Sequence, residues 1–206
     1  MQRIYLDNNA TTLVDPRVVK IVCDDLSGPP ANPSSVHWFG IKAKQKLMEA
    51  REKCAIFFHS KPEEILFTSS GTESISLMLN GLNRKGHLIT TNIEHSAMEK
   101  AIQKLEKEGM RVTWLECGIT GAPDPDRVEQ AITSDTQALV FSLSNSETGV
   151  RLDLERMCAI AEKKGIPLLL DGVAYIGKEI FFQHSAIQAV AISGHKFHAP
   201  KGTGLL

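Results

Sequence analysis

The chain has 206 residues, of which 42% are hydrophobic and 23% are charged, and its formal net charge is −1. This composition is typical of a globular domain, and the near-neutral charge gives no reason to expect nucleic acid or a membrane surface as a partner. The N-terminus lacks a charged segment followed by an apolar one, so no signal peptide is expected. No apolar run approaches the roughly 20 residues that span a bilayer.

The four cysteines are Cys23, Cys54, Cys117 and Cys158. No two of them have CxxC spacing and no histidines cluster with them, so we expect neither a metal site nor a disulfide framework. Unpaired cysteines are typical of a reducing compartment, which predicts a cytoplasmic protein. Cys54 and Cys158 lie in helical, partly apolar patterns and are expected to be core residues.

Short apolar runs alternate with segments of helical periodicity. The predicted strands are 4–7, 65–68, 87–91, 112–116, 138–143, 167–171 and 189–193. The predicted helices are 41–58, 72–82, 97–108, 125–132 and 153–164. The runs 138–143 and 168–170 are apolar without alternation, which indicates strands covered on both faces. This order predicts an α/β domain with a mostly parallel, seven-stranded sheet flanked by helices.

Ligands of such sheets bind beyond the carboxyl ends of the strands. The segment 69–73, SSGTE, follows one predicted strand and begins a helix, where free N–H groups and the helix dipole favour a phosphate. The same residues also suit an ordinary helix cap. His95 follows the next strand, and the polar turn 145–149 follows a later one. Taken singly, these are a surface histidine and a plain loop.

Asp171 and Lys196 end two predicted strands and are 25 residues apart. A carboxylate at the end of a buried strand needs a positive partner, which a protonated pyridine nitrogen or a neighbouring Lys or Arg would provide. Lys196 lies in a rigid turn with Pro200 and Gly202, where its amine could attack an aldehyde, or it is a surface lysine. Together with the phosphate cradle, these groups match what pyridoxal phosphate requires.

At this point the sequence resembles a known family, the cysteine desulfurases of the class V, fold-type-I pyridoxal-phosphate enzymes. The matching stretches are YLDNNATT (5–12), NPSSVHWFG (32–40), FTSSGTES (67–74), EHSA (94–97), NSETG (145–149), the Asp171 turn and SGHKFHAPKGTG (193–204). They follow the family order from one end of the chain to the other. The resemblance covers only the N-terminal half or so of a full-length member.

The resemblance implies a role for each matching position. Lys196 would hold pyridoxal phosphate as a Schiff base and then act as an acid–base group, and His95 would stack on the pyridine ring and assist proton transfer. Asp171 would pair with the ring nitrogen. The phosphate would be bound by four further residues, Gly71, Thr72, Ser193 and His195. The implied reaction converts L-cysteine to L-alanine and leaves sulfur on an enzyme cysteine as a persulfide.

Three positions depart from the family pattern. Ser146 stands where members usually have Asn, Ala174 where they have Gln, and Ser70 where they have Gly. The first two normally contact the phenolic oxygen of the cofactor, and Ala174 has no hydrogen-bonding side chain. Losing one such contact costs roughly 1 kcal/mol.

The resemblance also implies a division of the chain and several partners. We expect residues 1–14 to be an N-terminal segment and residues 15–206 a cofactor-binding large domain, which ends before the C-terminal small domain. In the family, that missing portion carries the sulfur-accepting cysteine loop and the arginine that binds the substrate carboxylate. The complete enzyme is expected to be a homodimer, with a sulfur-acceptor or scaffold protein as a further partner and a role in iron–sulfur cluster or other sulfur-compound biosynthesis.

Two alternatives to a cysteine desulfurase stay open at this stage. One is another class V activity, such as a selenocysteine lyase or an aminotransferase. The other is a non-catalytic truncated or degenerate paralogue, which Ser146 and Ala174 favour.

Overall fold

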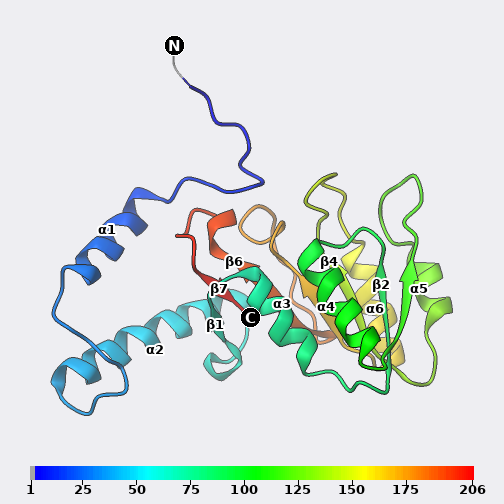
Figure 1. The fold of residues 1–206 in the computed structure, drawn as a ribbon, viewed down its shortest axis with the longest axis horizontal. Helices are drawn as coiled ribbons and strands as arrows, with labels where there is room; N and C mark the ends of the chain where they lie inside the picture. The colour runs from blue at the N-terminus through cyan, green and yellow to red at the C-terminus, as the bar shows by residue number, and fades with distance from the viewer. Residues whose placement is uncertain (1–2) are drawn as a thin grey trace.

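The structure, a computed structural model, describes residues 3–206, so Met1 and Gln2 of the predicted N-terminal segment lie outside the described residues. Its helices are α1 (Pro16–Leu26), α2 (Trp38–Phe58), α3 (Gly71–Asn80), α4 (Ser96–Lys107), α5 (Pro125–Ala131) and α6 (Leu154–Lys164), with two short 3-10 helices, η1 (Pro62–Glu64) and η2 (Gly194–Lys196) (Figure 1). Its strands are β1 (Phe67–Thr68), β2 (His87–Thr91), β3 (Arg111–Leu115), β4 (Thr136–Ser142), β5 (Leu168–Asp171), β6 (Ile187–Ser193) and β7 (Gly204–Leu205).

The strands form one seven-stranded sheet in the order β1-β7-β6-β5-β4-β2-β3. The neighbours from β6 to β3 are all parallel, whereas β7 runs antiparallel to both β6 and β1. The predicted mostly parallel α/β sheet is therefore confirmed. Parallel strands need long crossovers, and the helices between them supply these and cover the sheet.

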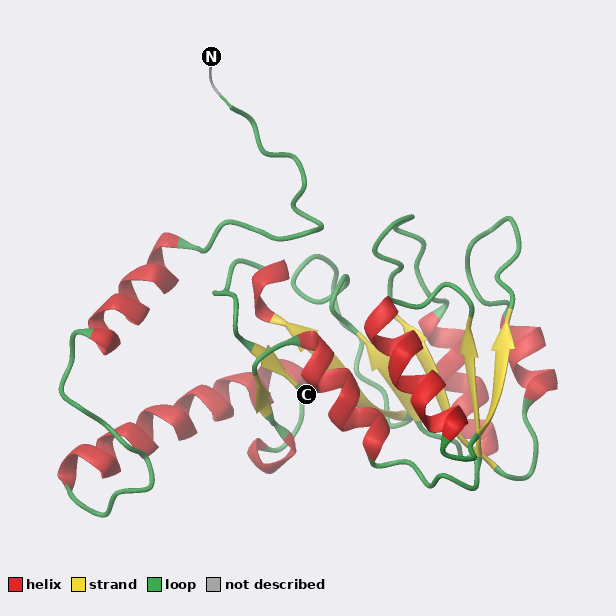
Figure 2. Ribbon diagram, in the orientation of Figure 1, coloured by secondary structure: helices red, strands yellow, loops and turns green. Residues whose placement is uncertain are grey.

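Alternate residues of the strands face two separate cores. Leu88 and Leu169 belong to a cluster with residues of α3 and α4, whereas Ile89 and Leu170 belong to a cluster with residues of α5 and α6. Figure 2 shows α3 and α4 on one side of the strands and α5 and α6 on the other. The strands are buried on both faces, as their unbroken apolar runs predicted.

The helix α1 was not predicted from the sequence, although its start carries a clear signal. Asp15 caps it by accepting a hydrogen bond from the Arg17 N–H, and Pro16 occupies the first turn. Both residue types are favoured at these positions. The valines and isoleucine of the segment favour strands and obscured this pattern. None of the residues of α1 is buried.

The predicted strand at 4–7 is wrong. These residues are irregular, and Ile4 and Leu6 are 78% and 84% exposed. An isolated apolar run becomes a strand only when it pairs with a neighbour, and residues 4–7 pair with none of the strands that the structure describes. Helix α2 begins three residues before its predicted start, with His37 as its cap.

The cysteines lie in different environments. Cys158 is buried in the core on α6, as predicted, whereas Cys54 and Cys117 are half-buried and Cys23 is exposed. All four are free thiols. Among residues 3–206, none of the helices is long and apolar enough to cross a membrane.

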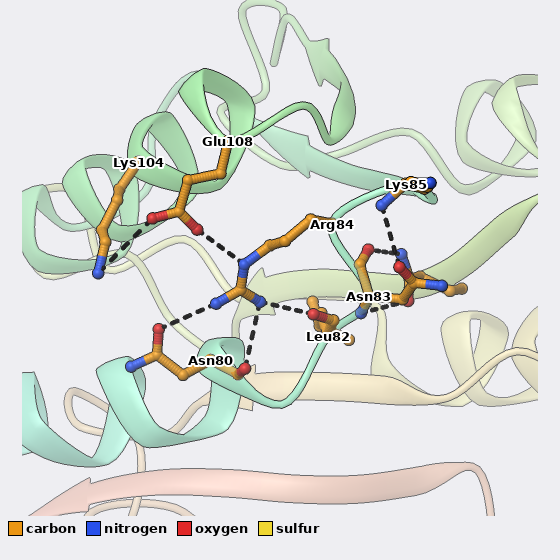
Figure 3. Close-up of polar contacts among 8 residues, drawn as sticks. Asn80, Leu82, Asn83, Arg84, Lys85, Lys104 and Glu108 are labelled. Carbon is orange, nitrogen blue, oxygen red and sulfur yellow. Dashed lines mark hydrogen bonds and ion pairs between the residues drawn. The ribbon is translucent and has the colours of Figure 1, made fainter.

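Arg84 ties the carboxyl ends of α3 and α4 together (Figure 3). Its Nε donates to Oε2 of Glu108 at 2.7 Å, and its Nη1 donates to the carbonyl oxygens of Asn80 and Leu82 at 3.1 and 2.5 Å. These carbonyls follow the last turn of α3, where helices leave acceptors without intrahelical donors. The contact holds the two helices in register over the same face of the sheet.

Candidate active site

The carboxyl ends of four parallel strands bring the predicted site residues to one edge of the sheet. Ser142 at the end of β4 is in register with Asp171 at the end of β5, and Asp171 is in register with Ala191 of β6. Strand β6 then leads directly into η2, which ends at Lys196. The predicted adjacency of the strands that carry Asp171 and Lys196 is thus confirmed.

Asp171 is a buried carboxylate without a cation partner. Its side chain is 5% exposed and accepts one hydrogen bond, from the Val173 N–H at 2.9 Å. None of the ion pairs within residues 3–206 includes it. Burial raises the pKa of Asp171, while the Val173 hydrogen bond and the charges of His95 and Lys196 lower it. A buried carboxylate in this position is stabilised by a cationic partner.

Lys196 lies beside the N-terminal segment. Its Nζ donates to the backbone oxygen of Asn9 at 2.6 Å. The preceding residue, His195, has Nδ1 3.1 Å from Oγ1 of Thr11, and its backbone oxygen accepts from the Thr12 N–H at 2.9 Å. Burial and the nearby Lys196 charge lower the pKa of His195. These contacts hold residues 9–12 against the turn that carries Lys196.

The N-terminus of α3 lies next to the end of β6. A Cβ atom added to Gly71 would come within 2.6 Å of Cγ2 of Val173 and 3.2 Å of Cβ of Ser193, so this position has no room for a side chain. Ser70 caps the helix by accepting from the Glu73 N–H at 3.2 Å, which confirms the cap interpretation. Among the described residues, the N–H groups of Gly71 and Thr72 have no acceptor outside the helix. They remain available for an anion.

His95 is an exposed residue that caps α4, and its Nδ1 accepts from the Ala97 N–H at 3.1 Å. His95 and Asp171 lie at the same end of the sheet, because His95 follows the carboxyl end of β2 and Asp171 ends β5, and these strands are both parallel to β4. The loop before His95 is joined to the turn that follows β4, because Nδ2 of Asn145 donates to the Ile93 backbone oxygen at 2.8 Å.

Glu94 fastens the same loop from inside the protein. Its Oε2 accepts from the N–H and the hydroxyl of Ser142 at 2.9 and 2.5 Å, and its Oε1 accepts from Oγ1 of Thr91 at 2.5 Å. The carboxylate thereby joins the ends of β2 and β4. Burial raises the pKa of Glu94 to about 7; the charge of Asp171 acts in the same direction and the hydrogen bonds oppose it.

We expect Glu94→Gln to change how stability depends on pH. The pKa of Glu94 in the folded protein is about 7, above its ordinary value of 4.5, so the folded state binds more protons between these values. The parent therefore loses stability as the pH rises through this window, and the neutral glutamine does not. Urea unfolding across the window should show the variant gaining roughly 3 kcal/mol relative to the parent.

A matched control for this experiment is Glu99→Gln. Glu99 is exposed in the first turn of α4 and accepts only from Nε2 of Gln103. Its variant should follow the pH profile of the parent. Parallel profiles for Glu94→Gln and the parent would contradict a buried, titrating Glu94.

The two departures at positions 146 and 174 line one open cavity. Its volume is about 550 Å³, and its walls also include Asn9, Tyr175 and Lys178. Asn9 connects this cavity to Lys196, because its side-chain amide donates to the Ser146 backbone oxygen and its own backbone oxygen accepts from Lys196.

Three residues of this region had no predicted role: Asn9, Glu94 and Lys178. Asn9 and Glu94 lie inside the motifs that carry the resemblance, and Glu94 is an acidic residue just past a buried strand, a signal that could have been used. Nothing in the sequence around Lys178 shows that it meets Asn9, which is 169 residues away.

The residues present fit pyridoxal phosphate in three respects. Asp171 is a buried carboxylate without a cation, which suits a pyridinium nitrogen. The close approach at Gly71 and the free N–H groups beside it suit a phosphate. Lys196 ends η2, which follows the strand next to that of Asp171, and its amine suits an aldehyde.

The fold and this grouping define a class of protein: an α/β domain with an anion cradle, a buried carboxylate and an amine at one edge of a mostly parallel sheet. Residues 4–206 match the model of the family "Aminotransferase class-V", and the chain belongs to this family. The families of this class and of the cysteine desulfurases depend on pyridoxal phosphate.

Among curated proteins, the chain is 38% identical to a cysteine desulfurase of Nostoc sp., covering 100% of this chain and 53% of the relative. It is 37% identical to the cysteine desulfurase IscS of Pseudomonas fluorescens, covering 98% and 52%. The chain thus spans about half the length of the curated relatives it matches.

Solved structures agree with this relationship. A NifS-like protein superimposes with a TM-score of 0.93 at 34% identity, covering 99% of this chain and 58% of that chain. A structure described as SspA in complex with cysteine gives a TM-score of 0.89 at 31% identity, covering 98% and 60%. The expected fold-type-I large-domain architecture is confirmed.

Proposed function

We propose that this chain is the cofactor-binding part of a pyridoxal-phosphate-dependent cysteine desulfurase. The observation that carries the proposal is the buried carboxylate of Asp171, which forms no ion pair within residues 3–206 and lies on the strand next to the one that leads to Lys196. An isolated buried carboxylate is costly in a folded protein, and a bound pyridinium ring compensates that cost. The similarity to cysteine desulfurases over the whole chain supports the same cofactor.

Each predicted site residue then has a task that its position allows. Lys196 would hold the cofactor through its aldehyde, to which a lysine amine can bond covalently. Asp171 keeps the ring nitrogen protonated, and the ring when bound withdraws electrons from the substrate. His95 lies against the ring and assists proton transfer. The N–H groups of Gly71 and Thr72, with Ser193 and His195, bind the phosphate.

The proposed reaction converts L-cysteine to L-alanine. The bond between Cβ and sulfur breaks, sulfur forms a new S–S bond with the thiolate of an enzyme cysteine, and Cβ takes up a proton. Lys196 would move the proton at Cα of the substrate. The similarity to a protein described in complex with cysteine supports cysteine as a substrate. A role in iron–sulfur cluster or other sulfur-compound biosynthesis, with an acceptor or scaffold protein, is part of the proposal.

The sulfur-accepting thiol is proposed to come from a segment that this chain does not contain. Burial raises the pKa of Cys54 and Cys117, and it raises that of Cys158 to about 11. A nucleophilic cysteine needs the opposite shift, because the thiolate is the reactive form. Cys23 is exposed on α1, away from the strand ends. Four free thiols also support the proposed cytoplasmic location.

The test of the proposed function is reductive trapping. The chain is incubated with pyridoxal phosphate, reduced with borohydride, digested and mapped by mass spectrometry. We expect the adduct on Lys196 at a low cofactor concentration, and a change in the visible spectrum of the unreduced protein when L-cysteine is added. An adduct spread evenly over exposed lysines would contradict a built cofactor site and would favour a non-catalytic paralogue, the reading that Ser146 and Ala174 support.

We also propose that the complete protein is a homodimer. The surface formed by α1 and α2 is apolar and exposed: Ile21 is 61%, Leu26 82% and Trp38 62% exposed. Large apolar side chains exposed in this number favour an interface. Figure 1 shows these two helices extending away from the sheet.

Sedimentation velocity measurements should therefore show association that increases with protein concentration. Leu26→Lys with Trp38→Lys should weaken it, whereas substitutions of the exposed Lys100 should not. A single monomeric species at every concentration would contradict the proposal for this chain.

A further inference from the structure

Asn9 holds two lysine amines close to each other. Its side-chain Oδ1 accepts from Nζ of Lys178 at 2.8 Å, and its backbone oxygen accepts from Nζ of Lys196 at 2.6 Å. Both amine nitrogens therefore bind the same residue, Asn9. The cavity that contains Lys178 is also the one lined by Ser146 and Ala174.

Neither amine is neutralised by a carboxylate. None of the ion pairs within residues 3–206 includes Lys178 or Lys196. Partial burial and the charge of Lys196 lower the pKa of Lys178. Two ammonium groups that share one asparagine repel each other, so a negative group between them would be stabilised.

The carboxylates near Lys178 do not supply this negative group. Glu147 lines the same cavity without forming an ion pair with Lys178, and Glu179 is paired with Arg151 at 3.0 Å. The charge of Lys196 lowers the pKa of Asp171, but Asp171 forms no ion pair with either lysine. The Asn9 side chain thus holds the ammonium group of Lys178, which forms no ion pair within residues 3–206, close to Lys196.

Pyridoxal phosphate would place an oxygen in this space. Its phenolic oxygen is on the ring carbon next to the one that carries the aldehyde, so in the Schiff base it lies beside the nitrogen supplied by Lys196. The family resemblance assigns amide side chains at positions 146 and 174 to this oxygen, and here they are Ser146 and Ala174. Ala174 and Lys178 line the same cavity.

We propose that Lys178, held by Asn9, binds the phenolic oxygen of the cofactor and takes the place of the amide donor missing at Ala174. This inference rests on the proposed function. An ammonium group beside this oxygen stabilises the phenolate and opposes a second positive charge on the adjacent Schiff-base nitrogen. Lys178 therefore lowers the pKa of the Schiff base between Lys196 and the cofactor.

The test is a pH titration of the visible spectrum of the cofactor-loaded chain, in which protonated and neutral Schiff bases absorb at different wavelengths. Lys178→Met should raise the midpoint by about one pH unit or more, since it removes a charge within a few ångströms. Lys178→Arg should keep most of the parent's midpoint. Lys107→Met, an exposed position on α4, is the matched control and should change nothing.

A second arm measures cofactor affinity by equilibrium dialysis. Lys178→Met should weaken binding about tenfold, the loss expected for a charge-assisted hydrogen bond. Ala174→Gln in the Lys178→Met background restores the missing donor and should recover most of this loss.

The outcomes separate this inference from the function on which it rests. If the parent traps the cofactor on Lys196 but Lys178→Met titrates like Lys107→Met, the role of Lys178 is wrong and the proposed function stands. If Ala174→Gln fails to rescue affinity, Lys178 does not replace the amide donor. If the folded parent traps nothing on Lys196, the proposed function itself fails, and the role of Lys178 with it.

Discussion

Lys196→Ala should abolish the covalent adduct with pyridoxal phosphate. Lys196 is the only lysine among the predicted site residues. It ends η2, which follows the strand next to that of Asp171. Removing it leaves an aldehyde with no primary amine in the proposed position, so the visible Schiff-base band and the borohydride-trapped peptide should both disappear. We expect loss of the adduct, because the neighbouring amine of Lys178 is bound to the Asn9 side chain and does not take the position of the Lys196 amine.

The variant should keep its fold, since Lys196 makes one hydrogen bond at the surface of the strand ends, worth about 1 kcal/mol. Thermal unfolding of the cofactor-free variant checks this. Lys201→Ala, an exposed lysine in the following turn, is the control and should trap the cofactor as the parent does. Full trapping by Lys196→Ala on another lysine would show that the proposed amine is wrong.

Asp171→Asn should have opposite effects on stability and on cofactor binding. Burial raises the pKa of Asp171, so the folded state binds more protons than the unfolded state just above the ordinary pKa of 3.8. The cofactor-free parent therefore loses stability as the pH rises through that window. Asparagine can still accept the Val173 hydrogen bond, and at neutral pH the cofactor-free variant should be about 1–2 kcal/mol more stable than the parent.

Cofactor binding should weaken in the same variant. An asparagine cannot pair with a pyridinium nitrogen as an anion, and losing a hydrogen bond to a charged group costs about 1.5–3 kcal/mol, or about 10- to 100-fold in affinity. Urea unfolding without cofactor and dialysis with cofactor measure the two effects. Asp153→Asn, at the cap of α6, is the control and should leave affinity unchanged. A cofactor-free variant less stable than the parent would mean that Asp171 has a structural cation partner.

The main elements of the fold could be predicted because each carries a local signal. The apolar runs of β4 and β5 indicated strands covered on both faces, and residues of these strands do face cores on both sides of the sheet. Such patterns depend on residues only a few positions apart. Where the local signal conflicted, the prediction was wrong: residues 4–7 have strand-like side chains but no partner, and α1 has a helix cap but β-branched residues.

Some residues of the candidate site could likewise be predicted from the sequence and others could not. Gly71, Asp171 and Lys196 could be located from the sequence because each follows a recognisable strand, and parallel strands end at a common edge. Their proposed roles came from the family resemblance. The sequence does not reveal the role of Glu94, because the hydrogen bonds that join it to Ser142 connect residues that are 48 positions apart.

By itself, the sequence determined the order of elements, the α/β class, and the residues that follow each strand, since side-chain periodicity and turn chemistry are local. Only the tertiary structure decided that Asp171 forms no ion pair with any residue that the structure describes, and that Asn9 joins Lys178 to Lys196. Asn9 and Lys196 are 187 residues apart, and no local pattern specifies their contact. Such a contact depends on how the N-terminal segment packs over the strand ends, and therefore on the whole sheet being in place.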